Sequence, residues 1–318
     1  MITTVTPNPS LDRTLHLPRF VPGDVNRATS TMVEPSGKGV NVALALHGVG
    51  VPARAVLPVG GGAGDEITVL LDDLGLDHVD VPIAGVLRSN ITLVEADGRT
   101  SKVNEPGPEL SEAEADALCA KSLSVSTSGD WVVWAGSLPS GFTPQRLAAV
   151  VAESRADGRF VALDCSGSPL KHVLAQQGGA LPHLVKPNAG ELAEVTGRSL
   201  RTVGDVTDAA QLLHARGVRI VLVSLGSDGA LLVDADLPQP LHGTAAVRRV
   251  VNTVGAGDAL LAGWLAAVDA GATGADALAN ALRFGATAVE HGGTLLGVPD
   301  SGRPVSIVAA AAQLPLNR

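Results

Sequence analysis

The densest group of residues that could do chemistry is the segment Gly255-Ala256-Gly257-Asp258. A β-branched run at residues 247–251 precedes it and a mainly apolar helical pattern at residues 259–270 follows it, so we expect a strand, a turn and a helix. Glycines in such a turn let successive backbone N–H groups approach an anion at the positive end of a helix. The segment therefore predicts a phosphate-binding turn, or simply a tight turn.

Asp258 is the unusual member of this turn. A carboxylate there could cap the helix, or it could be a base built into a phosphate-binding turn. We expect the positive end of the helix to lower the pKa of Asp258 and to keep it ionised at neutral pH.

A second glycine-rich segment opens a helical pattern at residues 40–49 and contains Gly37, Lys38, Gly39 and Asn41. It is not a Walker A loop, because Gly39 stands where Ser or Thr is required. The run at residues 60–65 does not match G-x-G-x-x-G either, since Asp65 takes the last glycine position. Close helix packing or contact with a substrate both explain the glycines.

Two further segments follow strand-like runs. Lys186 and Asn188 precede Glu191, and the N-x-x-E spacing is typical of a capping box, although the same oxygens could hold a hydrated Mg²⁺ on nucleotide phosphates. The second segment contains Ser224, Gly226 and Gly229. It predicts a turn between strands, or a loop that lets a nucleotide approach the backbone.

The elements that must position these residues alternate between strands and helices. Apolar runs that predict strands lie at residues 2–6, 54–59, 131–135, 160–164, 184–186 and 220–224. Helical patterns such as residues 144–156 and 206–216 separate them. This repetition predicts an α/β fold with a mostly parallel sheet between helix layers.

More polar, alternating sequence interrupts this pattern at residues 10–35 and 82–105. We expect antiparallel strands that pair into one small sheet over the carboxyl edge of the large sheet, where open α/β folds bind ligands. Asp12, Arg27 and Arg88 lie in these insertions, and any one of them alone would be expected to be a solvated surface residue. The predicted domains are residues 1–9, 36–81 and 106–318 for the large domain and residues 10–35 and 82–105 for the β lid.

Composition excludes several classes of protein. The net charge of −9 disfavours nucleic acid as a partner. The 2 cysteines and the scattered histidines match no disulfide framework and no common zinc module. The N-terminus lacks the pattern of a signal peptide and no apolar run could span a membrane, so we expect a cytoplasmic protein with no membrane partner.

Several motifs occur together in one order, and their order is more specific than any one of them. They are Thr6-Pro7-Asn8-Pro9-Ser10-Leu11-Asp12, Gly37-Lys38-Gly39-Val40-Asn41, Gly136-Ser137-Leu138-Pro139, Lys186-Pro187-Asn188 with Glu191, Ser224-Leu225-Gly226 and Thr253-Val254-Gly255-Ala256-Gly257-Asp258. In this order the chain resembles the ribokinase/PfkB carbohydrate kinases, and in particular their phosphosugar branch. The resemblance implies a ribokinase-like three-layer α/β/α sandwich with a small β-sheet lid.

The resemblance also implies roles for the site residues. Asp258 takes the proton of the sugar hydroxyl, and the amides of Gly255, Ala256, Gly257 and Asp258 hold the transferring phosphoryl group. Asp12, Gly37 and Asn41 hold sugar hydroxyls, and Gly39 also binds the substrate. Ser137 lies near the phosphosugar, Arg27 and Arg88 bind its phosphate, and Lys38 lies beside the phosphates. The residues expected to bind Mg-ATP are Lys186, Asn188, Glu191, Ser224, Gly226 and Gly229.

Within this branch we expect ATP-dependent and Mg²⁺-dependent phosphorylation of fructose 1-phosphate to fructose 1,6-bisphosphate. Tagatose 6-phosphate and fructose 6-phosphate are the alternative substrates, and a non-catalytic sugar-phosphate-binding protein is the alternative from another class. The edges of the lid sheet could pair in a homodimer.

Overall fold

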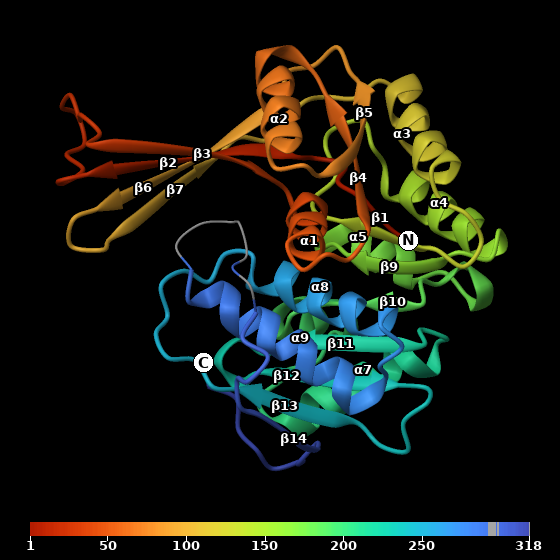
Figure 1. Cartoon of the computed structure of the whole chain (residues 1–318). Helices are drawn as coiled ribbons and strands as arrows, with labels where there is room; N and C mark the ends of the chain where they lie inside the picture. The colour runs from red at the N-terminus through yellow and green to blue at the C-terminus, as the bar shows by residue number, and fades with distance from the viewer. Residues whose placement is uncertain (292–296, 298, 318) are drawn as a thin grey trace.

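The large sheet forms the centre of the molecule in the computed structural model, which describes residues 1–291, 297 and 299–317 (Figure 1). Residues 292–296, 298 and 318 of the predicted large domain lie outside this description. The strands of the large sheet are β1 (Ile2–Val5), β4 (Ala53–Val59), β5 (Asp77–Pro82), β8 (Trp131–Ala135), β9 (Phe160–Asp164), β10 (Leu184–Val185), β11 (Ile220–Ser224), β12 (Ala230–Asp234), β13 (Leu241–Ala245) and β14 (Val305–Ala309).

These 10 strands are ordered β14-β13-β12-β11-β10-β9-β8-β1-β4-β5. Pairing is parallel from β11 to β5 and antiparallel from β11 to β14. Each of the six apolar runs predicted as strands forms one, because both of its faces are covered by helices. The loops that follow β1, β8, β9, β10 and β11 therefore meet at one edge of the sheet.

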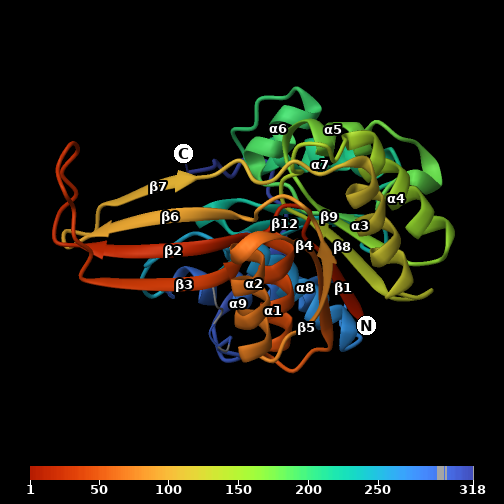
Figure 2. The ribbon, with the colours of Figure 1, turned by 90° about the horizontal axis from the view of Figure 1, so that it is seen from above.

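Helices cover both faces of the sheet (Figure 2). One layer contains α1 (Lys38–His47), α2 (Gly61–Asp73), α8 (Ala256–Asp269) and α9 (Gly274–Val289). The other contains α3 (Glu112–Ser124), α4 (Pro144–Ala156), α5 (Gly167–Leu174), α6 (Ala189–Thr196) and α7 (Val203–Ala215). Short 3₁₀ turns lie at η1 (Gly178–Ala180) and η2 (Gly226–Asp228).

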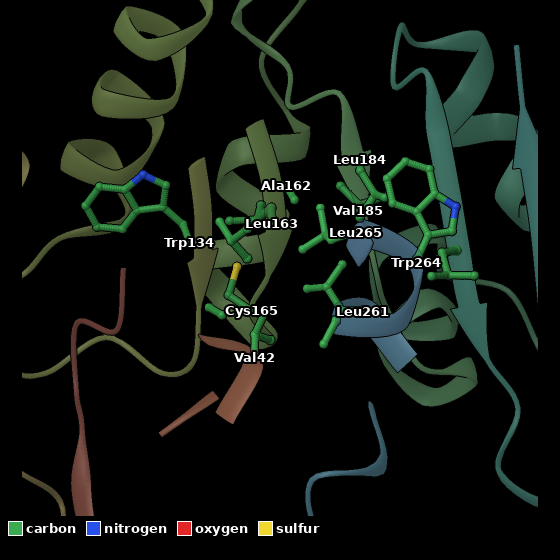
Figure 3. Packing of buried hydrophobic residues seen from close by; sticks show 14 of the residues in the cluster. Val42, Trp134, Ala162, Leu163, Cys165, Leu184, Val185, Leu261, Trp264 and Leu265 are labelled. Carbon is green, nitrogen blue, oxygen red and sulfur yellow. The ribbon is translucent and has the colours of Figure 1, made fainter. Parts of the chain in front are cut away.

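The core lies between these layers and consists largely of aliphatic side chains. In Figure 3, Leu261 and Leu265 of α8 lie toward Leu163 of β9 and Val185 of β10. All four are fully buried, so α8 is fixed against the sheet along its length. Among the described residues, no helix is long and apolar enough to cross a membrane.

A second sheet projects from the body of the molecule (Figures 1 and 2). It consists of β2 (Ser10–Leu17), β3 (Ser30–Ser36), β6 (Arg88–Glu95) and β7 (Thr100–Asn104), in the order β3-β2-β6-β7. Each insertion forms an antiparallel pair, as predicted, and parallel pairing of β2 with β6 joins the two. We call this sheet the lid.

The predicted strand at residues 247–251 is wrong. This segment is an extended loop in which Val247, Val250 and Val251 are exposed. Its polar groups bond to the end of α9 instead of to a strand, since Val251 N donates to Val289 O and Arg248 N donates to Glu290 Oε1. The β-branched composition favours a strand locally, but the adjacent edge of β13 is already occupied by β14.

Candidate active site

The glycine-rich turn leads directly into α8. Gly255 is the N-cap residue and has a left-handed φ of 76°, which a glycine adopts without strain. Asp258 lies in the first turn of the helix and is only 6% exposed. Its Oδ2 accepts a hydrogen bond of 2.8 Å from Nδ2 of Asn41 in α1. The helix-cap interpretation of Asp258 is therefore wrong, because the cap position belongs to Gly255 and the carboxylate turns to a neighbouring helix.

Two lysines flank a buried carboxylate beside this turn. Asp164 ends β9, and its Oδ1 and Oδ2 each lie 3.0 Å from an ammonium nitrogen, of Lys38 and of Lys186 respectively. Burial favours the neutral acid, but the charges of Lys186 and Lys38 hold the pKa of Asp164 below its ordinary value. A Cβ built on Gly257 would lie 3.1 Å from Nζ of Lys186, so this ammonium group lies against the glycine turn. Positive charge is thus concentrated where a phosphoryl group would meet Asp258.

Burial raises the pKa of Asp258 to about 6, and the negative charge of Asp164 adds to the shift. The hydrogen bond from Asn41 and the charges of Lys186 and Lys38 oppose it only in part. The prediction that the helix N-terminus lowers this pKa is therefore wrong, because a helix end contributes about 1 kcal/mol or less whereas burial can shift a pKa by several units. At pH 7 the group is still mainly ionised, and it is a stronger base than an ordinary aspartate.

Gly37 and Gly39 let the start of α1 pack against the end of β1. A Cβ on Gly37 would lie 2.6 Å from Cγ2 of Thr6, and one on Gly39 would lie 2.4 Å from Oγ1 of Thr6. Gly37 also has a positive φ of 127°. This close approach positions Lys38 and Asn41 at the carboxyl edge of the sheet, beside Asp258.

Asp12 lies at the base of the lid, opposite Asn90 on the neighbouring strand. Its Oδ1 accepts hydrogen bonds from Oγ of Ser10 at 3.0 Å and from Nδ2 of Asn90 at 2.9 Å. Both donors bond to the same oxygen of Asp12. The amide oxygens of Asn90 and Asn41 are buried without a partner among the described residues. Buried polar groups are normally satisfied, so each of these oxygens needs a hydrogen-bond donor, such as a hydroxyl group of a bound ligand.

Arg88 and Ser137 are connected through Asn8. Arg88 donates to the backbone oxygens of Asn8 and Glu105, at 3.1 and 3.3 Å, and Nδ2 of Asn8 lies 3.2 Å from Oγ of Ser137. Burial lowers the pKa of Arg88, and the nearby charge of Asp12 opposes this shift. Nε of Arg88 is buried without a partner in the described part of the chain. The two residues predicted for the sugar phosphate therefore lie in one hydrogen-bonded group.

Arg27 does not join this group within one chain. It is exposed in the loop between β2 and β3, at the free end of the lid, whereas Arg88 begins β6 at the base. β2 spans 8 residues between these two ends, which corresponds to about 25 Å at roughly 3.3 Å per residue. A single subunit therefore cannot bring both arginines to one phosphate in this arrangement.

A cavity of about 590 Å³ adjoins the turn on its other side. Its lining includes the glycine or polar residues Asn188, Ser224, Gly226, Gly229 and Gly257. It also includes the apolar residues Val250, Leu260, Leu282, Ala286 and Val289, which we call the apolar wall. A cavity lined both by apolar side chains and by backbone and polar groups suits a nucleotide base and ribose. The predicted turn between strands is also present, because β11 and β12 form an antiparallel pair across η2.

Asn188 and Glu191 form the capping box of α6. Asn188 N donates to Oε2 of Glu191 at 2.8 Å, and Glu191 N donates to Oδ1 of Asn188 at 2.9 Å. Asn188 also lines the cavity, and its strand segment pairs with Ser224. Glu191 is half-buried, and its second carboxylate oxygen, Oε1, is of the type that binds a water molecule on Mg²⁺.

Sequence reasoning missed Asp164, Asn90 and the apolar wall of the cavity. Asp164 could have been found, because it is a carboxylate at the carboxyl end of a predicted buried strand. The apolar wall could not, since Leu282 and Val289 follow the ordinary core pattern of α9. Asn90 becomes distinctive only when β6 pairs with β2.

Comparison with known proteins agrees with this geometry. The model of the pfkB family carbohydrate kinases matches residues 6–301. A 1-phosphofructokinase of Xanthomonas campestris pv. campestris is 35% identical over 314 residues, or 98% of each chain. One of Haloferax volcanii is 37% identical over 301 residues, or 94% of each chain. The structure of phosphofructokinase-2 from Escherichia coli in complex with potassium matches with a TM-score of 0.87 and 32% identity, covering 93% of this chain and 94% of that chain. The predicted ribokinase-like fold is confirmed, and the chain belongs to the pfkB family of carbohydrate kinases.

Proposed function

We propose that the chain is a 1-phosphofructokinase, which transfers the γ-phosphoryl group of ATP to the free primary hydroxyl of fructose 1-phosphate and yields fructose 1,6-bisphosphate. The similarity to 1-phosphofructokinases along 94–98% of the chain is the observation that carries the choice of substrate. The buried Asp258 at the glycine turn supports catalysis over mere binding, because a sugar-phosphate sensor needs no base at that position.

The reaction follows from the positions of the side chains. Asn41 occupies Oδ2 of Asp258, so Oδ1 takes the proton of the attacking hydroxyl. A bond forms between the sugar oxygen and the γ-phosphorus while the bond from that phosphorus to the bridging oxygen of ADP breaks. The backbone N–H groups of residues 255–258 and the ammonium group of Lys186 stabilise the charge of the moving phosphoryl oxygens. The proton then passes from Asp258 to solvent.

ATP lies in the 590 Å³ cavity in this proposal, with its phosphates toward Gly257. Mg²⁺, when bound, would neutralise phosphate charge, and Asn188 and Glu191 are the residues that would hold it through water molecules. Their oxygens fit this role, because a hard cation prefers carboxylate and amide oxygens and Mg²⁺ keeps most of its waters. We propose a cytoplasmic location, which suits an enzyme that uses ATP and a phosphosugar.

We infer a homodimer that pairs through the lid. By strand register, Leu15, Val33, Ile91, Leu93 and Val103 share the face of the lid opposite to Asp12. Val33 packs against the core at the base of the lid, Val103 is 58% exposed, and the other three are half-buried. An apolar sheet face that leaves the body of the molecule is best covered by a second copy of itself. Such a pairing also lets Arg27 of one subunit reach the phosphate site of the other.

Mixing two variants tests this arrangement. Arg27→Ala and Arg88→Ala should each weaken binding of the sugar phosphate. If Arg27 acts on the partner subunit, a mixed dimer of the two variants has one site with both arginines intact and one site with neither. Recovery of activity at low phosphosugar concentration after subunit exchange supports the dimer. Mass spectrometry verifies that subunits have exchanged. If activity does not recover in a verified mixed dimer, Arg27 acts on its own subunit or on no site.

A coupled assay of ADP formation tests the activity itself. The panel contains fructose 1-phosphate, fructose 6-phosphate, tagatose 6-phosphate and free fructose, each with Mg-ATP. We expect the highest kcat/KM with fructose 1-phosphate and little turnover of free fructose. Preference for either 6-phosphate would change the substrate, and phosphosugar binding without ADP formation would identify a sensor.

A further inference from the structure

We infer that Asn8 is a positioning residue that makes the site selective for a phosphorylated sugar, and that it acts by holding Ser137 and Arg88 in one rigid group. This inference rests on the proposed phosphosugar site. Asn8 lies in the turn between β1 and β2 and is 3% exposed. The hydrogen bonds that connect Arg88, Asn8 and Ser137 are called the Asn8 bridge below.

The Asn8 bridge joins three loops and the lid. Nδ2 of Asn8 donates to Oγ of Ser137 and to the backbone oxygen of Pro106, both at 3.2 Å. The backbone oxygen of Asn8 accepts from Nη2 of Arg88 at 3.1 Å, and Nη1 of Arg88 donates to the oxygen of Glu105. The loop before α3 therefore holds both Asn8 and Arg88, and Asn8 in turn holds Ser137 of the loop after β8.

The contact with Pro106 fixes the orientation of the Asn8 amide. A backbone carbonyl accepts hydrogen bonds only, so the nitrogen of the amide must face it. The other hydrogen of the same nitrogen is then directed to Ser137, whose hydroxyl acts as an acceptor. Because that hydroxyl accepts from Asn8, its own hydrogen is free to be donated to a different acceptor. The oxygen of a sugar phosphate is such an acceptor.

Arg88 supplies the charge for the same anion. Its two terminal nitrogens are held by the oxygens of Asn8 and Glu105, and its Nε is buried without a partner among the described residues. A guanidinium group held in this way loses less entropy when it binds a phosphate. The Asn8 bridge thus arranges one neutral donor and one charged donor before the substrate arrives.

The packing around Asn8 requires a residue of this size. A Cβ on Gly107, which has a φ of 94°, would lie 2.2 Å from Oδ1 of Asn8, so the loop approaches the amide as closely as a glycine permits. Asn8→Asp keeps the shape but places a carboxylate oxygen against the oxygen of Pro106. It also draws the hydroxyl hydrogen of Ser137 away from the ligand and adds a negative charge near the phosphate.

Steady-state kinetics of single and double variants test the inference. We expect Asn8→Ala to raise the KM for fructose 1-phosphate about tenfold and Asn8→Asp to raise it about 100-fold, because charge-assisted hydrogen bonds are worth roughly 10–150-fold. The kcat and the KM for ATP should stay within about twofold of the parent. In the Ser137→Ala background, Asn8→Ala should add less than about threefold, since residues in one network are not additive.

A matched control is Asn280→Ala. It removes the hydrogen bond from Nδ2 of Asn280 in α9 to the backbone oxygen of Gly263 in α8, and it should leave the KM for the phosphosugar unchanged.

Three results would overturn the inference. They are equal effects of Asn8→Ala and Asn280→Ala on this KM, additive effects of Asn8→Ala and Ser137→Ala, and a loss in kcat alone. If Asn8→Ala does not fold, the Asn8→Asp protein of the same shape decides by the same criteria. Activity of the parent on fructose 1-phosphate tests the proposed function separately. The shift in unfolding temperature that fructose 1-phosphate causes reports binding of the phosphosugar. It can therefore be compared between variant and parent even if there is no turnover.

Discussion

Replacing Asp258 with asparagine should make the protein more stable and almost inactive at the same time. The pKa of Asp258 is raised by burial and by Asp164 from 3.8 to about 6. At about 1.36 kcal/mol per pKa unit, the ionised carboxylate costs about 3 kcal/mol of folding free energy at pH 7. Asp258→Asn removes this charge and keeps an oxygen for the hydrogen bond from Asn41. We expect the free energy of unfolding to rise by up to about 3 kcal/mol at pH 7.

The same variant should lose catalysis because it cannot accept the proton of the hydroxyl. Removal of a positioned base costs about 10²–10⁴ in rate, and the loss should fall on kcat with both KM values little changed. The coupled assay measures kcat on the folded variant. A decrease of less than about fivefold would refute the assignment of Asp258 as the base.

The gain in stability should depend on pH. A carboxyl group whose pKa is raised in the folded state binds its proton more tightly there, so the parent loses stability as the pH rises from about 4 to about 6. The variant has no such group. Urea unfolding should therefore show nearly equal stability near pH 4 and a more stable variant at pH 7.5. An equal difference at both pH values would show that packing, and not the buried charge, explains the gain.

Arg88→Ala should raise the KM for fructose 1-phosphate by about 10–150-fold with kcat little changed, and an unchanged KM would remove Arg88 from the phosphate site. Glu191→Gln keeps an oxygen for the capping box but deletes its charge, so the Mg²⁺ concentration for half-maximal activity should rise several-fold. An unchanged Mg²⁺ titration would leave Glu191 with the capping role alone. Asp164→Asn removes a charge that raises the pKa of Asp258, so the acid limb of kcat/KM, expected near pH 6 in the parent, should move to lower pH. A limb that does not move would show that another group sets it.

The local features of the site could be predicted from the sequence. The six apolar runs form strands of the large sheet, and α4 has the predicted bounds, Pro144–Ala156, because Pro144 and the cap Thr143 mark its start. The glycine turn before α8 and the capping box of Asn188 are also local patterns. Each depends on residues a few positions apart, so sequence spacing alone determines it.

Contacts between distant residues were decided only by the tertiary structure. Asn41 and Asp258 are 217 positions apart, and Lys38 lies 126 positions from Asp164. The upward shift of the Asp258 pKa comes from burial and from the charge of Asp164, and both depend on the packed chain, whereas the helix end is a local feature. The strand predicted at residues 247–251 was wrong for a similar reason, because local composition favoured a strand but the pairing of β13 with β14 is not local.

The lid shows most clearly which features local sequence patterns determine and which depend on tertiary structure. Alternation and turn residues identified two hairpins, but only the pairing of β2 with β6 places Asn90 beside Asp12 and separates Arg27 from Arg88 by the length of a strand. Strand pairing is non-local, and its register is set by which faces are buried after folding. The sequence by itself therefore determined which residues could do this chemistry and on which kinds of element they lie, whereas their distances, charges and partners required the packed chain.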